Sequence, residues 1–371
     1  MSDLEERKEM VQQIMFSGDG HGEGTGSVPR PVEVLAGAAL GEYGLGDARL
    51  RALRAFDRKE VLEVVPPSRK PFVLQMYDPS RASEDMLWSM LAWLRMLADE
   101  GLAVPEPVRS ADGTLLVPVS TEAGRRLCTL SSKVPGEQRR RRDLQPEDLR
   151  SVGRQAARIH VQAERFSPPE GFTRLTWGWE WIFGGEAPLW RTGGSIYSEA
   201  EMQVLEAAAE LARTDLEDLG TGGEVFGLIH RDLTLSNLLF HDEGVHIIDF
   251  DRCGWGYYLF DLAVTLQALG PGNRRGSALR FALIEGYRDE RNLPDDYQRY
   301  LATFVIMRLA SRINWGLQAP TGRPAPRQKT SFMSNAVGEI RRLLETRIYP
   351  AFLALETPME IVSSSGMFLA S

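Results

Sequence analysis

The spacing of apolar residues divides the chain into a strand-rich part followed by a longer helical part. Short apolar runs bounded by polar turns predict β-strands at 48–56, 61–65, 72–77, 114–119 and 126–131. A helix is expected between the third and fourth runs, because Ser83 is a good N-cap residue, Gly101 is a good terminator, and apolar residues recur at helical spacing between them. This order of elements describes an antiparallel sheet with one helix packed on it.

The remainder of the chain is mostly helical. Amphipathic periodicity predicts helices at 147–163, 198–220, 258–269, 278–288, 295–317 and 335–355. Ser198 and Glu201 form the S-x-x-E pattern of a capping box at the start of the second helix. Alternating glycines at 18–26 precede Pro29 and Pro31, so we interpret them as a linker rather than a phosphate-binding loop. We expect a flexible N-terminal segment at 1–30, a small β-rich lobe at 31–132, a large helical lobe at 133–356 and a C-terminal tail at 357–371.

The composition is that of an ordinary globular protein with an acidic balance. The 371 residues are 43% hydrophobic and 25% charged, and 43 Lys and Arg against 51 Asp and Glu give a net charge of −8. This charge argues against a basic body that wraps nucleic acid. The two cysteines argue against a disulfide scaffold, and the sequence shows neither a membrane-spanning apolar run nor a secretory signal. We expect a cytoplasmic protein with no nucleic-acid or membrane partner; the oligomeric state stays open.

Candidate chemistry is concentrated between residues 226 and 263. The apolar run 226–229 leads into His230 and Asp232, and Asn237 follows before a predicted hairpin that ends at Asp249. If residues 242–244 form a three-residue turn, Asn237 lies directly opposite Asp249, and directly opposed residues share one face of the hairpin. A bulge at the turn would shift this register by one residue. In either register, an amide oxygen and a carboxylate converge at one end of the hairpin.

These residue types suit phosphoryl transfer. Mg²⁺ usually accepts hard oxygen ligands such as those of Asn237 and Asp249, and leaves room for phosphates and water. Asp232, on the preceding loop, is placed to accept the proton of an attacking hydroxyl. Taken singly, Asp and Asn often cap turns, and His230 alone would suit a buried structural histidine. The joint pattern H-x-D-x₄-N, hairpin, D-F-D favours the catalytic interpretation.

The segment resembles the signature of the aminoglycoside phosphotransferase and choline kinase-like superfamily, which is related to the protein kinases. Gly254, Gly256 and Asp261 extend the match, and the resemblance covers roughly residues 31–355. It implies a bilobal, protein-kinase-like α+β fold with ATP and Mg²⁺ held in the cleft between the lobes. It also implies that Asp261 opens a helix and supports the catalytic loop by hydrogen bonds, with His230 as a further supporting residue.

The sequence departs from the family at two linked positions. In the family, a basic residue on the third strand contacts the nucleotide phosphates and pairs with a helix glutamate; here the corresponding residues are Gln75 and Met90. Gln75 can still donate a hydrogen bond to phosphate. Arg58 and Lys59, on the turn after the first strand, either supply the missing charge or are solvated turn residues, which we favour. The chain is therefore an active phosphotransferase or, alternatively, a weak or inactive kinase-like protein that binds nucleotide in a regulatory role.

The acceptor is not specified by the sequence. The resemblance implies a small hydroxyl compound, such as an aminoglycoside, an amino alcohol, homoserine or a sugar, or a protein serine or threonine. Aromatic residues near carboxylates suit a cationic acceptor, although packing is the interpretation we favour; these are Trp177, Trp179, Trp181 and Trp190, with Glu180 and Glu186. The strand containing Cys128 should lead into the hinge between the lobes, where Ser131, Ser132 and Lys133 would offer backbone groups to the adenine ring.

Overall fold

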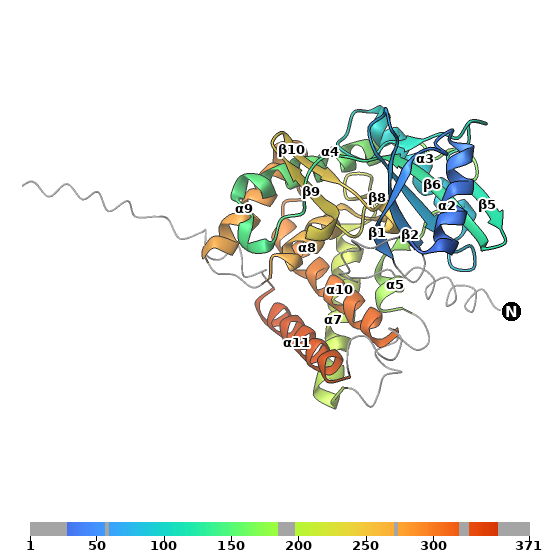
Figure 1. Cartoon of the computed structure of the whole chain (residues 1–371). Helices are drawn as coiled ribbons and strands as arrows, with labels where there is room; N and C mark the ends of the chain where they lie inside the picture. The colour runs from blue at the N-terminus through green and yellow to red at the C-terminus, as the bar shows by residue number, and fades with distance from the viewer. Residues whose placement is uncertain (1–27, 56–58, 185–196, 271–273, 319–325, 348–371) are drawn as a thin grey trace, which may run out of the picture.

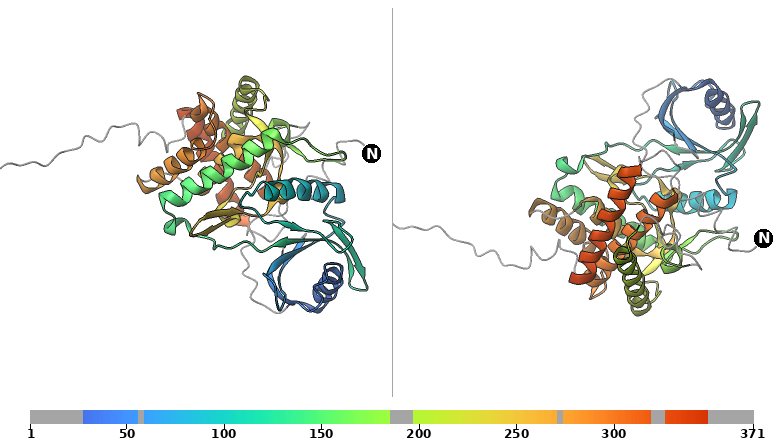
Figure 2. Two further views of the ribbon diagram at one scale, coloured as in Figure 1. Left: turned by 90° about the horizontal axis from the view of Figure 1, so that it is seen from above. Right: turned by 90° about the horizontal axis from the view of Figure 1, so that it is seen from below.

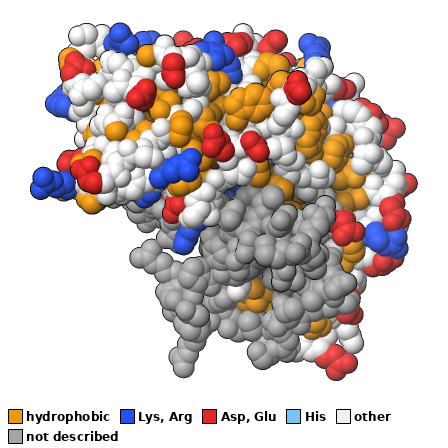
Figure 3. Space-filling model, turned by 90° about the vertical axis from the view of Figure 1, so that its right-hand side faces the viewer, with side chains coloured by type: hydrophobic (Ala, Val, Ile, Leu, Met, Phe, Trp, Pro, Cys, Tyr) orange, Lys and Arg blue, Asp and Glu red, His pale blue; other side chains and the backbone are white. Residues whose placement is uncertain are grey.

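The structure is a computed structural model that describes residues 28–55, 59–184, 197–270, 274–318 and 326–347. A sheet-based lobe carries α2 and α3, and a helical lobe contains α4 and α7–α11 (Figure 1). The fold is of the mixed α+β type expected from the sequence. Within the described ranges, none of the helices combines the length and apolar character needed to cross a bilayer. On the face shown in Figure 3, acidic and basic side chains are interspersed over the described residues.

The smaller lobe is built on a six-stranded antiparallel sheet with the order β1-β2-β3-β6-β4, to which β5 adds by pairing with β6. Its strands are β1 (Arg49–Ala55), β2 (Lys59–Val65), β3 (Phe72–Tyr77), β4 (Pro107–Val108), β5 (Val117–Thr121) and β6 (Gly124–Ser132). β3 has the predicted bounds. β2 begins two residues before the predicted strand, so Lys59 belongs to the sheet and pairs with Tyr77.

A helix that the sequence did not predict covers one face of this sheet. α2 (Arg30–Glu42) buries Leu35, Ala36 and Leu40 in one apolar cluster with sheet residues. The segment up to residue 30 was expected to be flexible, but α2 begins at Arg30 with Pro31 in its first turn, where proline is favourable because its missing N–H has no intrahelical partner there. The predicted 1–30 segment otherwise lies outside the described residues.

The predicted helix of the small lobe, α3 (Glu84–Asp99), lies between the sheet and the helical lobe. The Ser83 hydroxyl caps it by accepting the Met86 N–H at 3.4 Å, as expected from the sequence. Its predicted apolar face is buried in the larger core, which also contains residues of the helical lobe. The Trp93 ring meets Phe250 edge to face at 5.7 Å between centroids. α3 therefore packs against the loop that follows the hairpin, through Trp93 and Phe250.

The larger lobe contains α4 (Pro146–Arg165), α5 (Trp179–Ile182), α7 (Glu199–Leu219), α8 (Tyr258–Ala268), α9 (Arg274–Arg288), α10 (Tyr297–Gln318) and α11 (Pro326–Thr346). The capping box of α7 is present, because Ser198 and Glu201 each accept the other's backbone N–H. α11 begins earlier than predicted, and residues 348–355 of that prediction lie outside the described ranges. α4 and α9 lie side by side (Figure 2), with Gly153 against the backbone of α9.

Short strands complete the helical lobe. β8 (Phe226–Ile229) pairs with β11 (Gly254–Tyr257), which also pairs with β7 (Thr176–Trp177). Three-residue 3₁₀ helices occur at Arg141–Asp143, Leu235–Asn237 and Phe250–Arg252. β9 (Leu238–His241) and β10 (Gly244–Ile247) form the predicted hairpin.

The register of this hairpin differs by one residue from the expected one. His241 pairs with Gly244, so the turn contains two residues rather than three. The Ile248 N–H donates to the Asn237 carbonyl at 3.0 Å, which places Asn237 opposite Ile248 and not opposite Asp249. A one-residue slip would normally move a side chain to the other face. Asp249 is not in the strand conformation, since its φ is 68° and its ψ is 66°, so the alternation of faces along the strand does not apply to its side chain.

Candidate active site

A buried carboxylate holds the backbone of the loop that follows β8. Asp261, in the first turn of α8, accepts the His230 backbone N–H at 2.8 Å and the Arg231 backbone N–H at 2.6 Å. His160 of α4 lies 3.0 Å from Asp261 through Nε2, and its Nδ1 lies 2.9 Å from the Tyr287 hydroxyl. Burial lowers the pKa of His160 despite the neighbouring carboxylate, so the ring is neutral at pH 7. Arg231 is held with φ 69°, a conformation that L-residues adopt rarely.

His230 connects this loop to the end of the hairpin. Its Nε2 lies 3.0 Å from the Ile248 carbonyl, to which it donates, and its Nδ1 accepts the Asp232 backbone N–H at 3.2 Å. The ring also packs edge to face on Phe250, with 4.6 Å between centroids. His230 is fully buried, and these contacts fix the position from which the Asp232 side chain projects.

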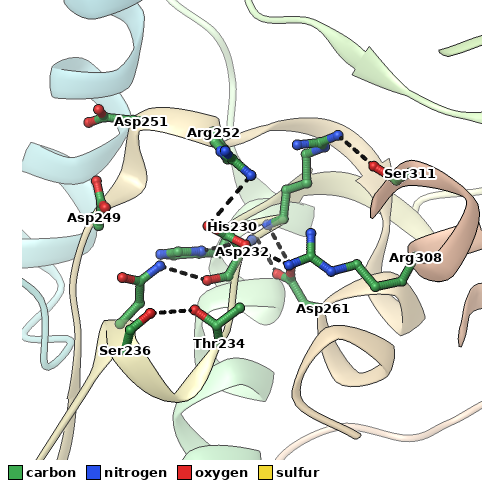
Figure 4. Close-up of polar contacts among 12 residues, drawn as sticks. His230, Asp232, Thr234, Ser236, Asp249, Asp251, Arg252, Asp261, Arg308 and Ser311 are labelled. Atoms are coloured by element: carbon green, nitrogen blue, oxygen red, sulfur yellow. Dashed lines mark hydrogen bonds and ion pairs between the residues drawn. The ribbon is translucent and has the colours of Figure 1, made fainter. Parts of the chain in front are cut away.

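Asp232 lies among basic side chains. Its Oδ1 accepts a hydrogen bond from Arg308 of α10 at 3.0 Å, and its Oδ2 lies 3.8 Å from Arg252. Figure 4 shows both guanidinium groups directed at this carboxylate. Burial alone would raise the pKa of Asp232, but Arg252 and Arg308 outweigh burial and hold it below the usual range. Asp232 is therefore ionised at neutral pH.

Asn237 and Asp249 lie at the same end of the hairpin. The Asn237 side chain donates through Nδ2 to the Asp232 carbonyl at 2.9 Å, which leaves its amide oxygen as an acceptor. Asp249 is 30% exposed and adopts a left-handed backbone conformation that Asp tolerates better than most residues. An amide oxygen and a partly exposed carboxylate are the hard donors that Mg²⁺ accepts. The residues present therefore fit a magnesium ion.

Lys59 is the basic side chain directed at this end of the hairpin. It is 3% exposed, and its Nζ lies 2.9 Å from Asp249 Oδ1 and 2.7 Å from Asp251 Oδ2. Burial would lower the pKa of Lys59, but the two carboxylates outweigh this effect and raise it. The expectation of a solvated turn residue is wrong for Lys59, because β2 begins at this position and directs the side chain inward. Arg58 lies outside the described residues.

The two departures from the family pattern have different surroundings. Met90 is buried on the apolar face of α3, as the periodicity predicts. The Gln75 side chain lies 3.1 Å from the Tyr77 hydroxyl, which also lies 2.9 Å from Asp251 Oδ1. Lys59 lies over the Tyr77 ring, 5.5 Å from its centroid, so this cation and Gln75 share Tyr77 as a neighbour.

The segment expected to meet an adenine ring, residues 131–133, lies at the end of β6. Ser131 pairs on both sides, with β3 and β4. The Ser132 N–H donates to Glu106 at 2.9 Å and the Lys133 N–H donates to Pro71 at 3.1 Å. The Lys133 ammonium forms an ion pair with Glu63 at 2.5 Å. The Ser132 and Lys133 N–H groups are therefore bonded within the protein at the end of β6, and contact of this segment with an adenine ring stays a prediction.

The described tryptophans of the aromatic segment are packed. Trp177 is 2% exposed and meets Trp181 edge to face, while the Trp179 indole donates to the Ala209 carbonyl at 2.6 Å. The Arg231 guanidinium lies over the Trp177 ring, 3.4 Å from its centroid. An arginine of the chain itself therefore occupies that aromatic face. Trp190 and Glu186 lie outside the described residues.

Sequence reasoning did not select Asp251, Arg252, Arg174 or Arg308. Asp251 and Arg252 lie two and three positions after Asp249, so the D-F-D-R run was the sequence signal that could have identified them. Arg174 fixes the backbone of this run by donating to the carbonyl groups of Asp251 at 2.7 Å and Cys253 at 2.6 Å. Arg308 is 76 positions from Asp232, on a different helix. No local motif connects those two residues.

The fold and this site define a protein-kinase-like phosphotransferase. A family model described as "Phosphotransferase enzyme family" matches residues 56–301, and the chain belongs to this family. Over 230 residues the chain is 30% identical to a homoserine kinase of Sinorhizobium fredii; the match covers 61% of this chain and 66% of that kinase, just under two thirds of its length.

Solved kinases share the architecture. A microcompartment-associated aminopropanol kinase superposes with a TM-score of 0.72 and 25% identity, over 86% of this chain and 99% of that one. An amicoumacin kinase in complex with AMP-PNP, Ca²⁺ and Ami has a TM-score of 0.66 and 21% identity, over 79% of this chain and 88% of that one. The predicted kinase-like fold and family are confirmed. The chain is an enzyme of the kinase class, with an alcohol group as acceptor.

Proposed function

We propose that the protein uses ATP and Mg²⁺ to transfer the γ-phosphoryl group to a hydroxyl of a small molecule. The observation that carries this proposal is the arrangement around the loop held by Asp261. Asp232 projects from that loop, Asn237 is bonded to its backbone, and Asp249 lies at the end of the same hairpin. The relatives named for homoserine and aminopropanol support a small alcohol as the acceptor class.

In the proposed reaction, Asp232 orients the acceptor hydroxyl and receives its proton. The hydroxyl oxygen forms a bond to the γ-phosphorus, the bond from that phosphorus to the β–γ bridging oxygen breaks, and its electron pair leaves with ADP. Asn237 and Asp249 would hold Mg²⁺, which neutralises charge on the phosphates. His230 and Asp261 are positioning residues, because they keep the loop in place through backbone hydrogen bonds.

Lys59 is proposed as the cation that contacts the nucleotide phosphates, with Gln75 as a neighbouring hydrogen-bond donor. The weak or inactive alternative rests on the absence of a charge at Gln75 and of a glutamate at Met90. The ion pairs of Lys59 with Asp249 and Asp251 place a buried positive charge in that region. This favours the active enzyme. Two free, buried cysteines, Cys128 and Cys253, are compatible with the reducing cytoplasm in which we place the reaction.

The test is ADP release from Mg·ATP with L-homoserine, 1-amino-2-propanol, choline and glycerol as separate acceptors. Asp232→Asn should reduce acceptor-dependent ADP release by about 10²–10⁴-fold, the range associated with loss of a general base. Glu243→Gln is the matched control, because its side chain is exposed in the hairpin turn. If no alcohol stimulates ADP release, or if Asp232→Asn keeps the wild-type rate, the proposed function is wrong.

A further inference from the structure

Arg174 joins three segments of the chain that are far apart in the sequence. It lies two residues before β7 and is 9% exposed, so its guanidinium group is buried. Its three kinds of nitrogen donate to three different main-chain carbonyls: Nη1 to Met86 at 2.9 Å, Nη2 to Asp251 at 2.7 Å and Nε to Cys253 at 2.6 Å. The first carbonyl belongs to α3, and the other two follow the proposed metal ligand Asp249. One side chain therefore holds both α3 and the loop that carries the metal ligand.

The backbone that carries Arg174 is itself fixed in the helical lobe. The next residue, Leu175, accepts the Trp255 N–H at 2.9 Å, and β7 then pairs in parallel with β11. Gly254 lies so close to this backbone that a Cβ atom there would collide with the Leu175 carbonyl. Because the backbone has little freedom to move, the guanidinium group holds α3 and residues 251–253 from a fixed position.

Other contacts hold α3 against the helical lobe. The Ser89 hydroxyl, which is fully buried, accepts the Thr173 N–H at 2.9 Å and donates to the Asp85 carbonyl of its own helix at 2.7 Å. Further along α3, the Trp93 indole N–H donates to Gln162 of α4 at 3.2 Å. The hydrogen bond from Arg174 is therefore one of several that connect successive turns of α3 to the helical lobe.

These contacts affect the site through Lys59 and Asp249. α3 packs in one apolar core with Tyr77 of β3, and Tyr77 pairs with Lys59 in the sheet. The Lys59 ammonium lies 2.9 Å from Asp249, so this contact depends on the distance between the sheet and the loop after the hairpin. Met90 places an apolar side chain at the α3 position that corresponds to a glutamate in the family, and this side chain cannot pair with a cation. Arg174 instead holds α3 through its main chain.

We propose that Arg174 is a positioning residue for phosphoryl transfer, which keeps α3 and residues 251–253 at the separation at which Lys59 and Asp249 act on Mg·ATP. The inference rests on the proposed function, since it takes Asp249 as a metal ligand and Lys59 as a phosphate contact. A guanidinium group is planar and its donors point in fixed directions, so three carbonyls bound to it cannot move independently. An ammonium group is compact and lacks this geometry.

The first measurement is Mn²⁺ binding by electron paramagnetic resonance, with AMP-PNP and the full chain. Arg174→Met removes the three hydrogen bonds and keeps a long side chain; it should weaken Mn²⁺ binding about tenfold, as is typical when a residue that orients a metal ligand is lost. Arg174→Lys keeps the charge without the planar fork and should lie between Arg174→Met and wild type. Arg109→Met is the matched control, because Arg109 is exposed and also donates to a backbone carbonyl, that of Gly113 at 2.8 Å.

Two further measurements separate positioning from general stability, at a temperature where thermal melts show every variant folded. Hydrogen exchange followed by mass spectrometry should become faster in Arg174→Met both in the first half of α3 and in residues 249–257, while α7 keeps its wild-type protection. In the ADP-release assay, Arg174→Met should raise the KM for Mg·ATP about tenfold and leave the KM for the acceptor unchanged. Arg109→Met should change neither the exchange nor the two KM values.

Three outcomes overturn the inference. The first is wild-type Mn²⁺ affinity in Arg174→Met or in Arg174→Lys, because the planar set of hydrogen bonds would then not position the metal site. The second is faster exchange in only one of the two segments, which would show that Arg174 does not join them. The third is a raised KM for the acceptor with an unchanged KM for Mg·ATP, which would assign Arg174 to acceptor binding. If Arg174→Met does not fold, Arg174→Lys decides by the same measurements.

The failure of this inference differs from the failure of the proposed function. ADP release that depends on Asp232, together with wild-type Mn²⁺ affinity in the Arg174 variants, keeps the proposed function and overturns the inference. If the wild-type protein binds no Mn²⁺ with AMP-PNP, the proposed metal site is wrong, and the inference that rests on it is wrong too. If Mn²⁺ binds but no alcohol is phosphorylated, Mn²⁺ binding and hydrogen exchange still decide the inference, because neither needs an acceptor.

Discussion

Replacing Lys59 by methionine removes the ammonium group that pairs with both Asp249 and Asp251 while keeping a side chain of similar length. The lysine is 3% exposed, Asp251 is 14% exposed and Asp249 is 30% exposed. Removing one partner of a buried ion pair typically costs about 3–5 kcal/mol, because an uncompensated charge stays behind. Solvent at Asp249 reduces this cost. We therefore expect Lys59→Met to lower the free energy of unfolding by about 3 kcal/mol in metal-free buffer.

The assay is urea denaturation followed by circular dichroism, in EDTA and again with saturating Mg²⁺ and no nucleotide. A bound metal ion neutralises the same carboxylates, so the stability difference between wild type and Lys59→Met should become smaller with Mg²⁺. Lys70→Met, at an exposed position between β2 and β3, is the matched control and should change stability by less than about 0.5 kcal/mol. A Lys59→Met loss below about 1 kcal/mol in EDTA would refute the reasoning, since that is the value of an exposed ion pair.

Two further predictions concern the contact between α4 and α9 and the reactivity of the two buried cysteines. A methyl group at Gly153 would collide with the backbone of Leu283 and Tyr287 in α9, so Gly153→Ala should destabilise the protein by about 1–3 kcal/mol in urea denaturation. Gly338→Ala, in a helix with open space around it, should instead be neutral or stabilising by up to about 1 kcal/mol, and equal effects at the two sites would contradict the packing argument. Burial raises the pKa of Cys128 to about 12 and that of Cys253 to about 11. Because the thiolate is the reactive form, neither thiol should react with a disulfide reagent at pH 8 until urea unfolds the chain, and rapid labelling of the native protein would show that these thiols are accessible.

The catalytic loop and hairpin could be anticipated because their information is local. Asp232 and Asn237 lie five positions apart, and the hairpin that follows carries Asp249 only twelve positions later. The exact register could not be anticipated, since a turn of two or three residues fits the same polar run. The left-handed conformation of Asp249, whose carboxylate pairs with Lys59, could not be anticipated from this run either.

The other parts of the site depend on contacts between distant segments. Lys59 lies next to a polar turn, and whether it is in the turn or in the strand is decided by pairing with Tyr77. Arg308 lies on a long helix with no motif around it, and only the packing of α10 against α8 brings it to Asp232. The helix α2 was missed because residues 1–30 were interpreted as a flexible segment and no helix was assigned to the residues after it, although the first turn of a helix accepts proline.

The central claim is that Asn237 and Asp249 hold the metal ion beside Asp232. Its most direct test is electron paramagnetic resonance titration of Mn²⁺, used in place of Mg²⁺, with AMP-PNP and the full chain; this needs no knowledge of the acceptor. Wild-type protein and Glu243→Gln should bind Mn²⁺ with the same affinity, and Asp249→Asn and Asn237→Ala should each bind it at least about tenfold more weakly. Wild-type Mn²⁺ affinity in both Asp249→Asn and Asn237→Ala would contradict the account.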